Sequence, residues 1–101
     1  MTTTIDNSNG NSIISITGRL DSVTSPKFDS DIAPIYSPDQ SGDIIVDCAG
    51  LEYISSAGLR SLITLLKKSK AAGRTLELHN LPASIRTIFD MTGFTSIFTI
   101  I

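Results

Sequence analysis

Apolar and polar positions near the start of the chain follow a short period. The run Ser12-Ile13-Ile14-Ser15-Ile16-Thr17 alternates between the two kinds, and an apolar residue, Ile5, precedes it across the Asn9-Gly10 dipeptide. Alternation with period two is typical of a half-buried strand, and Asn-Gly between two such segments favours a tight turn. We therefore predict an antiparallel hairpin at the start of the chain.

The period then lengthens to that of a helix. Ser25 is a suitable N-cap, and Pro26 is suited to the first helical position. The apolar face of this predicted helix consists of Phe28, Ile32 and Ile35. Pro34 would remove a backbone hydrogen bond and clash with the preceding turn. We expect the helix to kink or end near Ala33.

A continuous apolar run comes next. The loop-forming segment 38–42 leads into residues 43–48, whose centre is Ile44-Ile45-Val46. An uninterrupted run of β-branched residues favours a strand that is buried on both faces. We predict a central strand here.

A second helix is predicted immediately after this strand. Its apolar stripe consists of Leu59, Leu62, Ile63, Leu65 and Leu66. Lys67, Lys68 and Lys70 lie near its carboxyl end, where cations favour the helix dipole, and Gly73 is suited to end it.

The rest of the chain continues this alternation. Residues 75–78 have strand periodicity, a third helix begins at Pro82, and residues 97–100 again have strand character. The predicted order is ββαβαβαβ, which requires an α/β fold with a mixed sheet: an antiparallel hairpin joined to parallel βαβ units. We expect residues 1–101 to form one domain, because this length suits a single core.

Two serines stand where the predicted central strand gives way to the second helix. Ser55 and Ser56 precede Ala57-Gly58-Leu59. The first N–H groups of a helix lack partners within it and lie at the positive end of its dipole, so they favour an anion. Serines are also common helix caps, and this structural role stays open for both.

Composition and charge exclude several classes of function. The net charge is −2, with 8 Lys and Arg against 10 Asp and Glu, and the chain has no basic run that could follow a nucleic acid backbone. Residues 1–6 contain neither a basic region nor a long apolar stretch, so we expect no secretory signal, no membrane insertion and a cytoplasmic location.

No pattern indicates catalysis or a cofactor. Cys48, the single cysteine, ends an apolar run and is expected to be a buried structural thiol. His79, the single histidine, has no partner spacing for a catalytic triad or a metal site. Phosphate-binding glycine-rich strings are absent from the sequence. We expect a protein that is not an enzyme and that holds no metal or cofactor.

Three motifs, together with the order of elements, resemble the STAS domain of the bacterial anti-sigma factor antagonist type over nearly the whole chain. The segment 17–21, Thr-Gly-Arg-Leu-Asp, is similar to the family's Gly-x-Leu-Asp segment after the second strand. Residues 54–59 are similar to its phosphorylation-site turn, and residues 89–94 to the end of its third helix.

The resemblance implies a phosphorylation site. In that family the turn commonly reads Asp-Ser-Ser-Gly or Asp-Ser-Thr-Gly, and a partner kinase phosphorylates the serine two places before the glycine. That position is Ser56 here. Ser55 stands where the family often has aspartate, which removes a carboxylate beside the acceptor and makes Ser55 a competing acceptor.

The resemblance also implies partners. We expect the unphosphorylated form to bind an anti-sigma factor with Ser/Thr kinase activity, and a PP2C-type phosphatase is a further candidate partner. The expected contact residues are Asp21, Ser55, Ser56, Ala57, Gly58, Arg60 and Met91. A local loop or cap role for Asp21, a solvated position on the helix surface for Arg60 and a core position for Met91 stay open. Gly58 is expected to leave room for another backbone. Alternatively, STAS domains serve as non-enzymatic subunits of lipid-transport ABC complexes or regulate other transporters.

Overall fold

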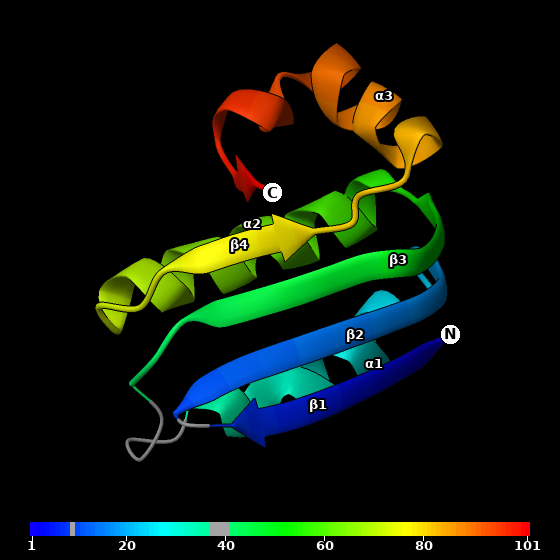
Figure 1. Ribbon diagram of the computed structural model, residues 1–101. Helices are drawn as coiled ribbons and strands as arrows, with labels where there is room; N and C mark the ends of the chain where they lie inside the picture. Colours follow the sequence, from blue (N-terminus) through cyan, green and yellow to red (C-terminus); the bar gives the residue numbers. More distant parts are fainter. Residues whose placement is uncertain (9, 37–40) are drawn as a thin grey trace.

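The strands form one sheet whose spatial order follows the order of the sequence. The computed structural model describes residues 1–8, 10–36 and 41–101, and in this part of the chain the sheet has five strands in the order β1-β2-β3-β4-β5 (Figure 1). These are β1 (Thr2–Ser8), β2 (Asn11–Leu20), β3 (Ile44–Ile54), β4 (Leu76–His79) and β5 (Thr99–Ile100). β1 and β2 pair antiparallel, and the remaining neighbours pair parallel. The predicted mixed sheet with a central third strand is confirmed.

Helices connect the parallel strands. The α-helices are α1 (Ser25–Ile32), α2 (Ser56–Ala71) and α3 (Ala83–Thr92), and the short 3-10 helices are η1 (Ala33–Tyr36) and η2 (Phe94–Ser96). α1 and α2 lie side by side on one face of the sheet, whereas α3 and η2 lie toward the edge formed by β4 and β5 (Figure 1). The predicted α/β order is confirmed.

The helices cover one face of the central strands and leave the other open. Ile14, Val46 and Leu78 lie next to one another across β2, β3 and β4, and all three are fully buried. Ile13 and Ile45, on the opposite face, are only half-buried. The prediction that segment 43–48 is buried on both faces is therefore wrong, because α1 and α2 pack against the same side.

The ends of the elements depart from the predictions by small amounts. α1 ends at Ile32 and passes into η1, as expected from Pro34, but its N-cap is Thr24 and Ser25 is already helical. The last strand is shorter than predicted, because the N–H groups of Ile97 and Phe98 donate back to the carbonyl oxygen of Phe94 and only Thr99–Ile100 pair with β4. Asn9 of the predicted turn and residues 38–40 of the predicted loop lie outside the described residues.

A buried arginine joins the segments at the amino ends of the parallel strands. Arg74 is only 5% exposed. Its guanidinium donates to the carbonyl oxygens of Ile35 at 2.6 Å and Gly42 at 2.7 Å, and to Oγ of Ser12 at 2.9 Å. These acceptors come from η1, the segment before β3 and the start of β2. One side chain thus fixes this end of the sheet.

Candidate functional site

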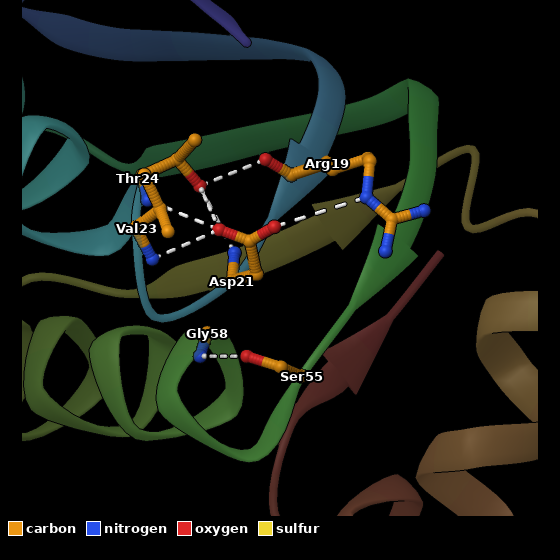
Figure 2. A network of polar contacts seen from close by, with 6 residues as sticks. All are labelled: Arg19, Asp21, Val23, Thr24, Ser55 and Gly58. Carbon is orange, nitrogen blue, oxygen red and sulfur yellow. Dashed lines mark hydrogen bonds and ion pairs between the residues drawn. The ribbon is translucent and has the colours of Figure 1, made fainter.

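The turn from β3 into α2 lies at the carboxyl end of the central strand. Ser55 is the N-cap of α2, and its Oγ accepts a hydrogen bond from the N–H of Gly58 at 3.3 Å (Figure 2). Its own N–H donates to the carbonyl oxygen of Leu20 at 3.0 Å, which attaches the turn to β2. The cap role that the sequence left open for both serines therefore belongs to Ser55.

Ser56 is the first residue of α2 and is exposed. Its position places the hydroxyl beside the free N–H groups at the start of a helix of 16 residues. The first turn of α2 carries no acidic residue. An anion attached to Ser56 would therefore meet the positive end of the helix dipole without a neighbouring carboxylate on that turn.

Gly58 is a packing residue of the domain itself. It is buried, and a Cβ added there would lie 2.4 Å from the carbonyl oxygen of Leu20 and 2.8 Å from the side chain of Ile54. The backbone that approaches this glycine is thus that of the same chain. The room that we expected at Gly58 is thus filled by β2, and the contact with a partner at this residue stays a prediction.

Asp21 organises the turn between β2 and α1. Its Oδ1 accepts hydrogen bonds from the N–H groups of Val23 at 3.0 Å and Thr24 at 3.1 Å, and its Oδ2 lies 3.8 Å from Nε of Arg19 (Figure 2). The hydrogen bond from the Thr24 backbone, with smaller contributions from Val23 and Arg19, holds the pKa of this carboxyl below its usual value. The local cap role is therefore established for Asp21.

Asp21 and Ser55 nevertheless stand at the same edge of the sheet. Leu20 and Ile54 are paired across β2 and β3, and Asp21 and Ser55 are the next residues after that pair. Val23, on the Asp21 turn, is 82% exposed. The carboxyl ends of two neighbouring parallel strands thus place both turns next to each other, as in Figure 2.

A cation–π contact beside these turns was not predicted from the sequence. The guanidinium of Arg19 lies over the ring of Tyr53, 4.2 Å from its centroid. Both residues are exposed, and they are partners in the pairing of β2 with β3. The pairing register would have been needed to find them, because 34 positions separate them in the sequence (53 minus 19).

An open groove lies beside Ser56, between α2 and the end of α3. Its volume is about 300 Å³. The lining residues are Ser56, Leu59, Arg60, Ile63, Thr92 and Phe94. Met91, adjacent to Thr92 in sequence, is 82% exposed. The structure therefore brings Ser56 and Arg60 together on one groove and leaves Met91 exposed on α3, while Ala57 is half-buried.

The remaining candidate groups have structural surroundings. Cys48 is fully buried, and burial raises the pKa of its thiol to about 12. Nε2 of His79 lies 2.9 Å from Oε1 of Glu77. Within the described ranges, no group of three His, Cys, Asp or Glu side chains is arranged to hold a metal ion. None of the helices in these ranges is long and apolar enough to cross a bilayer.

Three proteins that are similar to this chain carry the name of anti-sigma factor antagonist. The chain is 29% identical to BtrV of Bordetella bronchiseptica, a proposed anti-sigma factor antagonist, over 99% of this chain and 85% of that protein. It is 28% identical to the anti-sigma-B factor antagonist of Bacillus subtilis, over 86% of this chain and 78% of that one. A proposed anti-sigma factor antagonist from Thermotoga maritima has the same fold, with a TM-score of 0.86, 15% identity and coverage of 97% and 84%.

A family model supports the resemblance on which the site was predicted. The STAS domain model matches residues 2–101, so it includes both turns and the groove. The chain therefore belongs to the STAS domain family.

Proposed function

We propose that this protein is an anti-sigma factor antagonist that works as a phosphorylation switch. The unmodified surface around Ser56 binds an anti-sigma factor with Ser/Thr kinase activity, and this binding releases a sigma factor. Phosphorylation of Ser56 ends the binding, and a PP2C-type phosphatase restores it. The names of two curated relatives support the antagonist role.

The exposed position of Ser56 at the start of α2 carries the proposal. A kinase needs an accessible hydroxyl on a turn, and Ser55 is less suited because its Oγ is occupied as the cap. In the reaction, the terminal phosphoryl group of a nucleoside triphosphate is transferred to Oγ of Ser56. The hydroxyl proton passes to a base of the kinase, and the nucleoside diphosphate leaves.

Phosphorylation has opposite effects on the domain and on its complex. A phosphate adds about −1.5 to −2 charges, which the dipole of α2 favours by roughly 0.3 to 1 kcal/mol, so the domain stays folded. At an interface fitted to a neutral serine, the same charge must be desolvated, which costs on the order of several kcal/mol. Since about 1.4 kcal/mol changes affinity tenfold, binding falls by roughly two to four decades.

The neighbouring features define the rest of the contact surface. Val23, on the Asp21 turn, and Met91, near the end of α3, are both 82% exposed and supply apolar area, and Arg60 supplies a positive charge. Apolar side chains with this exposure are suited to the buried centre of an interface. Asp21 acts through the turn that it holds, which sets the position of Val23.

The test is a binding titration of the cognate anti-sigma factor against wild type, Ser56→Ala, Ser56→Asp and Ser55→Ala. Ser56→Ala is expected to bind like wild type and to accept no phosphate, whereas Ser56→Asp binds more weakly. Ser55→Ala is the matched control, because it removes the neighbouring hydroxyl and keeps the acceptor. Equal binding by all four proteins contradicts the switch.

Capture of partners from a cell lysate tests the class of partner separately. The proposal expects a soluble protein with a kinase fold to be enriched by wild type and depleted by Ser56→Asp. Recovery of a transporter ATPase in its place contradicts the proposal and supports the transporter-subunit alternative.

A further inference from the structure

We propose that Arg60 binds the phosphate of phosphorylated Ser56 within the same helix, so that modification also withdraws Arg60 from the contact surface. This inference rests on the proposed function, because the anion exists only after phosphorylation of Ser56. It makes Arg60 a positioning residue for the phosphate.

The spacing of the two residues carries the first step. Ser56 and Arg60 are four positions apart on α2, and both line the same groove. Side chains at this spacing are neighbours on a helix surface. Because side chains in a helix lean toward its amino end, Arg60 extends over the turn that contains Ser56. A guanidinium can thus reach a phosphate oxygen without any change of the backbone.

The order of charges along the helix also favours the pair. An acidic group four residues before a basic group stabilises a helix more than the reverse order. The negative charge is then nearer the positive amino end of the helix dipole, and the positive charge is nearer its negative carboxyl end. Phosphoserine at position 56 and arginine at position 60 have the favourable order. A guanidinium further suits a phosphate, since its planar donors can bind two oxygens at once.

Nearby groups leave Arg60 available. The ion pairs found in the described part of the chain are Arg19 with Asp21, Lys27 with Asp31, and His79 with Glu77. Asp90, on the helix that borders the groove, accepts a hydrogen bond from Thr95. Ser55 is a neutral cap, so it adds no negative charge beside the phosphate. None of the ion pairs in the described part of the chain includes Arg60, so its guanidinium is available on the groove side of α2.

The consequence is a switch with two components. In the unmodified protein, Arg60 is exposed and can contact an acidic group of the partner. After phosphorylation, the groove gains the negative charge of the phosphate, and Arg60 pairs with that phosphate and is no longer free to contact an acidic group of the partner. The added charge is that of the phosphate, and the loss of the Arg60 contact is a second effect on binding.

The test measures the second ionisation of the phosphate by ³¹P NMR. Phosphoserine is incorporated at position 56 during translation, so the sample does not depend on a kinase. Arg60→Gln is expected to raise the titration midpoint by roughly 0.3 pH unit, since i,i+4 pairs contribute a few tenths of a kcal/mol and one pKa unit is 1.36 kcal/mol. In the unsubstituted phosphoprotein, the Nε–H signal of Arg60 should move with the same midpoint as the phosphorus signal.

Lys67→Gln is the matched control, because it removes one positive charge from an exposed position of the same helix. It lies roughly 16 Å from Ser56 along the axis, beyond the screening length of about 8 to 10 Å, and should leave the midpoint unchanged. Arg60→Lys should recover only part of the effect. Equal midpoints for Arg60→Gln and Lys67→Gln, or an Arg60 signal that ignores the titration, overturn the inference.

The two proposals fail separately. If the anti-sigma factor phosphorylates Ser56 and binding is lost, but the midpoint does not depend on Arg60, the switch stands and the Arg60 pair is wrong. If the midpoint depends on Arg60 but no anti-sigma factor binds the unmodified protein, the pair stands and the proposed function is wrong.

Discussion

The two ends of the parallel strands use polar side chains in opposite ways. At the amino ends, Arg74 is buried, and its hydrogen bonds go to Ile35, Gly42 and Ser12 of the same chain. At the carboxyl ends, Ser56 is exposed at the start of a helix. The polar side chain at the amino ends joins segments of the chain, whereas the hydroxyl at the carboxyl ends stays accessible.

The difference follows from the architecture. In open α/β sheets, the turns after the carboxyl ends of strands carry ligand and partner sites, because helix amino ends with unpaired N–H groups gather there. The opposite end has no such groups to offer and is closed by internal contacts. We therefore expect substitutions at the Arg74 end to change stability, and substitutions at the Ser56 end to change binding.

Replacing Arg74 should have the largest effect on stability. Arg74→Met leaves the three acceptors of its guanidinium without their donor in a buried place, and we expect a loss of about 3 kcal/mol in the free energy of unfolding. Urea denaturation measures it. Arg86→Met, at an exposed arginine of α3, is the control and should change stability by less than about 0.5 kcal/mol. Equal effects of the two would remove the contrast between the ends.

Gly58→Ala tests how closely the start of α2, at the Ser56 end, packs against β2. The added methyl group would lie 2.4 Å from the carbonyl oxygen of Leu20, so the start of α2 must move away from β2. We expect a loss of roughly 2 kcal/mol, from the cost of overpacking. Gly73→Ala is less suitable as a control, because Gly73 has a positive φ.

Ala57→Ser serves as the matched change for Gly58→Ala, since Ala57 is a half-buried neighbour on the same helical turn. Thermal unfolding of both variants, compared with wild type, separates a specific clash from a general sensitivity of the turn. A Gly58→Ala protein as stable as wild type contradicts the close packing of α2 against Leu20.

Removing the cap of α2 should have a smaller effect. Ser55→Ala loses the hydrogen bond from the N–H of Gly58 to Oγ, and caps of this kind contribute about 1 kcal/mol. Ser55→Asp retains an acceptor and adds a charge that the helix dipole favours, so it should restore the stability. Urea unfolding compares the stability of the two variants. A Ser55→Asp protein that is less stable than Ser55→Ala would contradict the cap geometry.

The smallest effect is expected in the pH dependence that comes from Asp21. Its pKa is lowered in the folded protein, mainly by the hydrogen bond from the Thr24 backbone, so its contribution to stability is present at neutral pH. That contribution is lost as pH falls below about 4, through the lowered folded pKa. Asp21→Asn should flatten this part of the stability profile, as measured by urea midpoints across the acidic range. Asp29→Asn, on an exposed residue of α1, is the control.

Local sequence determined much of this protein. The alternating residues of β2, the proline that ends α1 and the apolar stripe of α2 each predict their element, because periodicity and backbone preference act within a few residues. The start of α2 at two serines was likewise predicted from the change of hydrophobic period at residues 54–59. The family resemblance then singled out Ser56, which the structure shows to be exposed.

Tertiary structure alone decided which of these features meet. Only the packing of α1 and α2 on the same side shows that Ile45 faces the open side of the sheet. Arg19 meets Tyr53, and Gly58 meets Leu20, through the pairing and packing of segments far apart in the sequence. Periodicity describes the faces of one element, but it contains no information on which other element will cover them. That choice depends on the register and packing of the whole sheet, which no local pattern specifies.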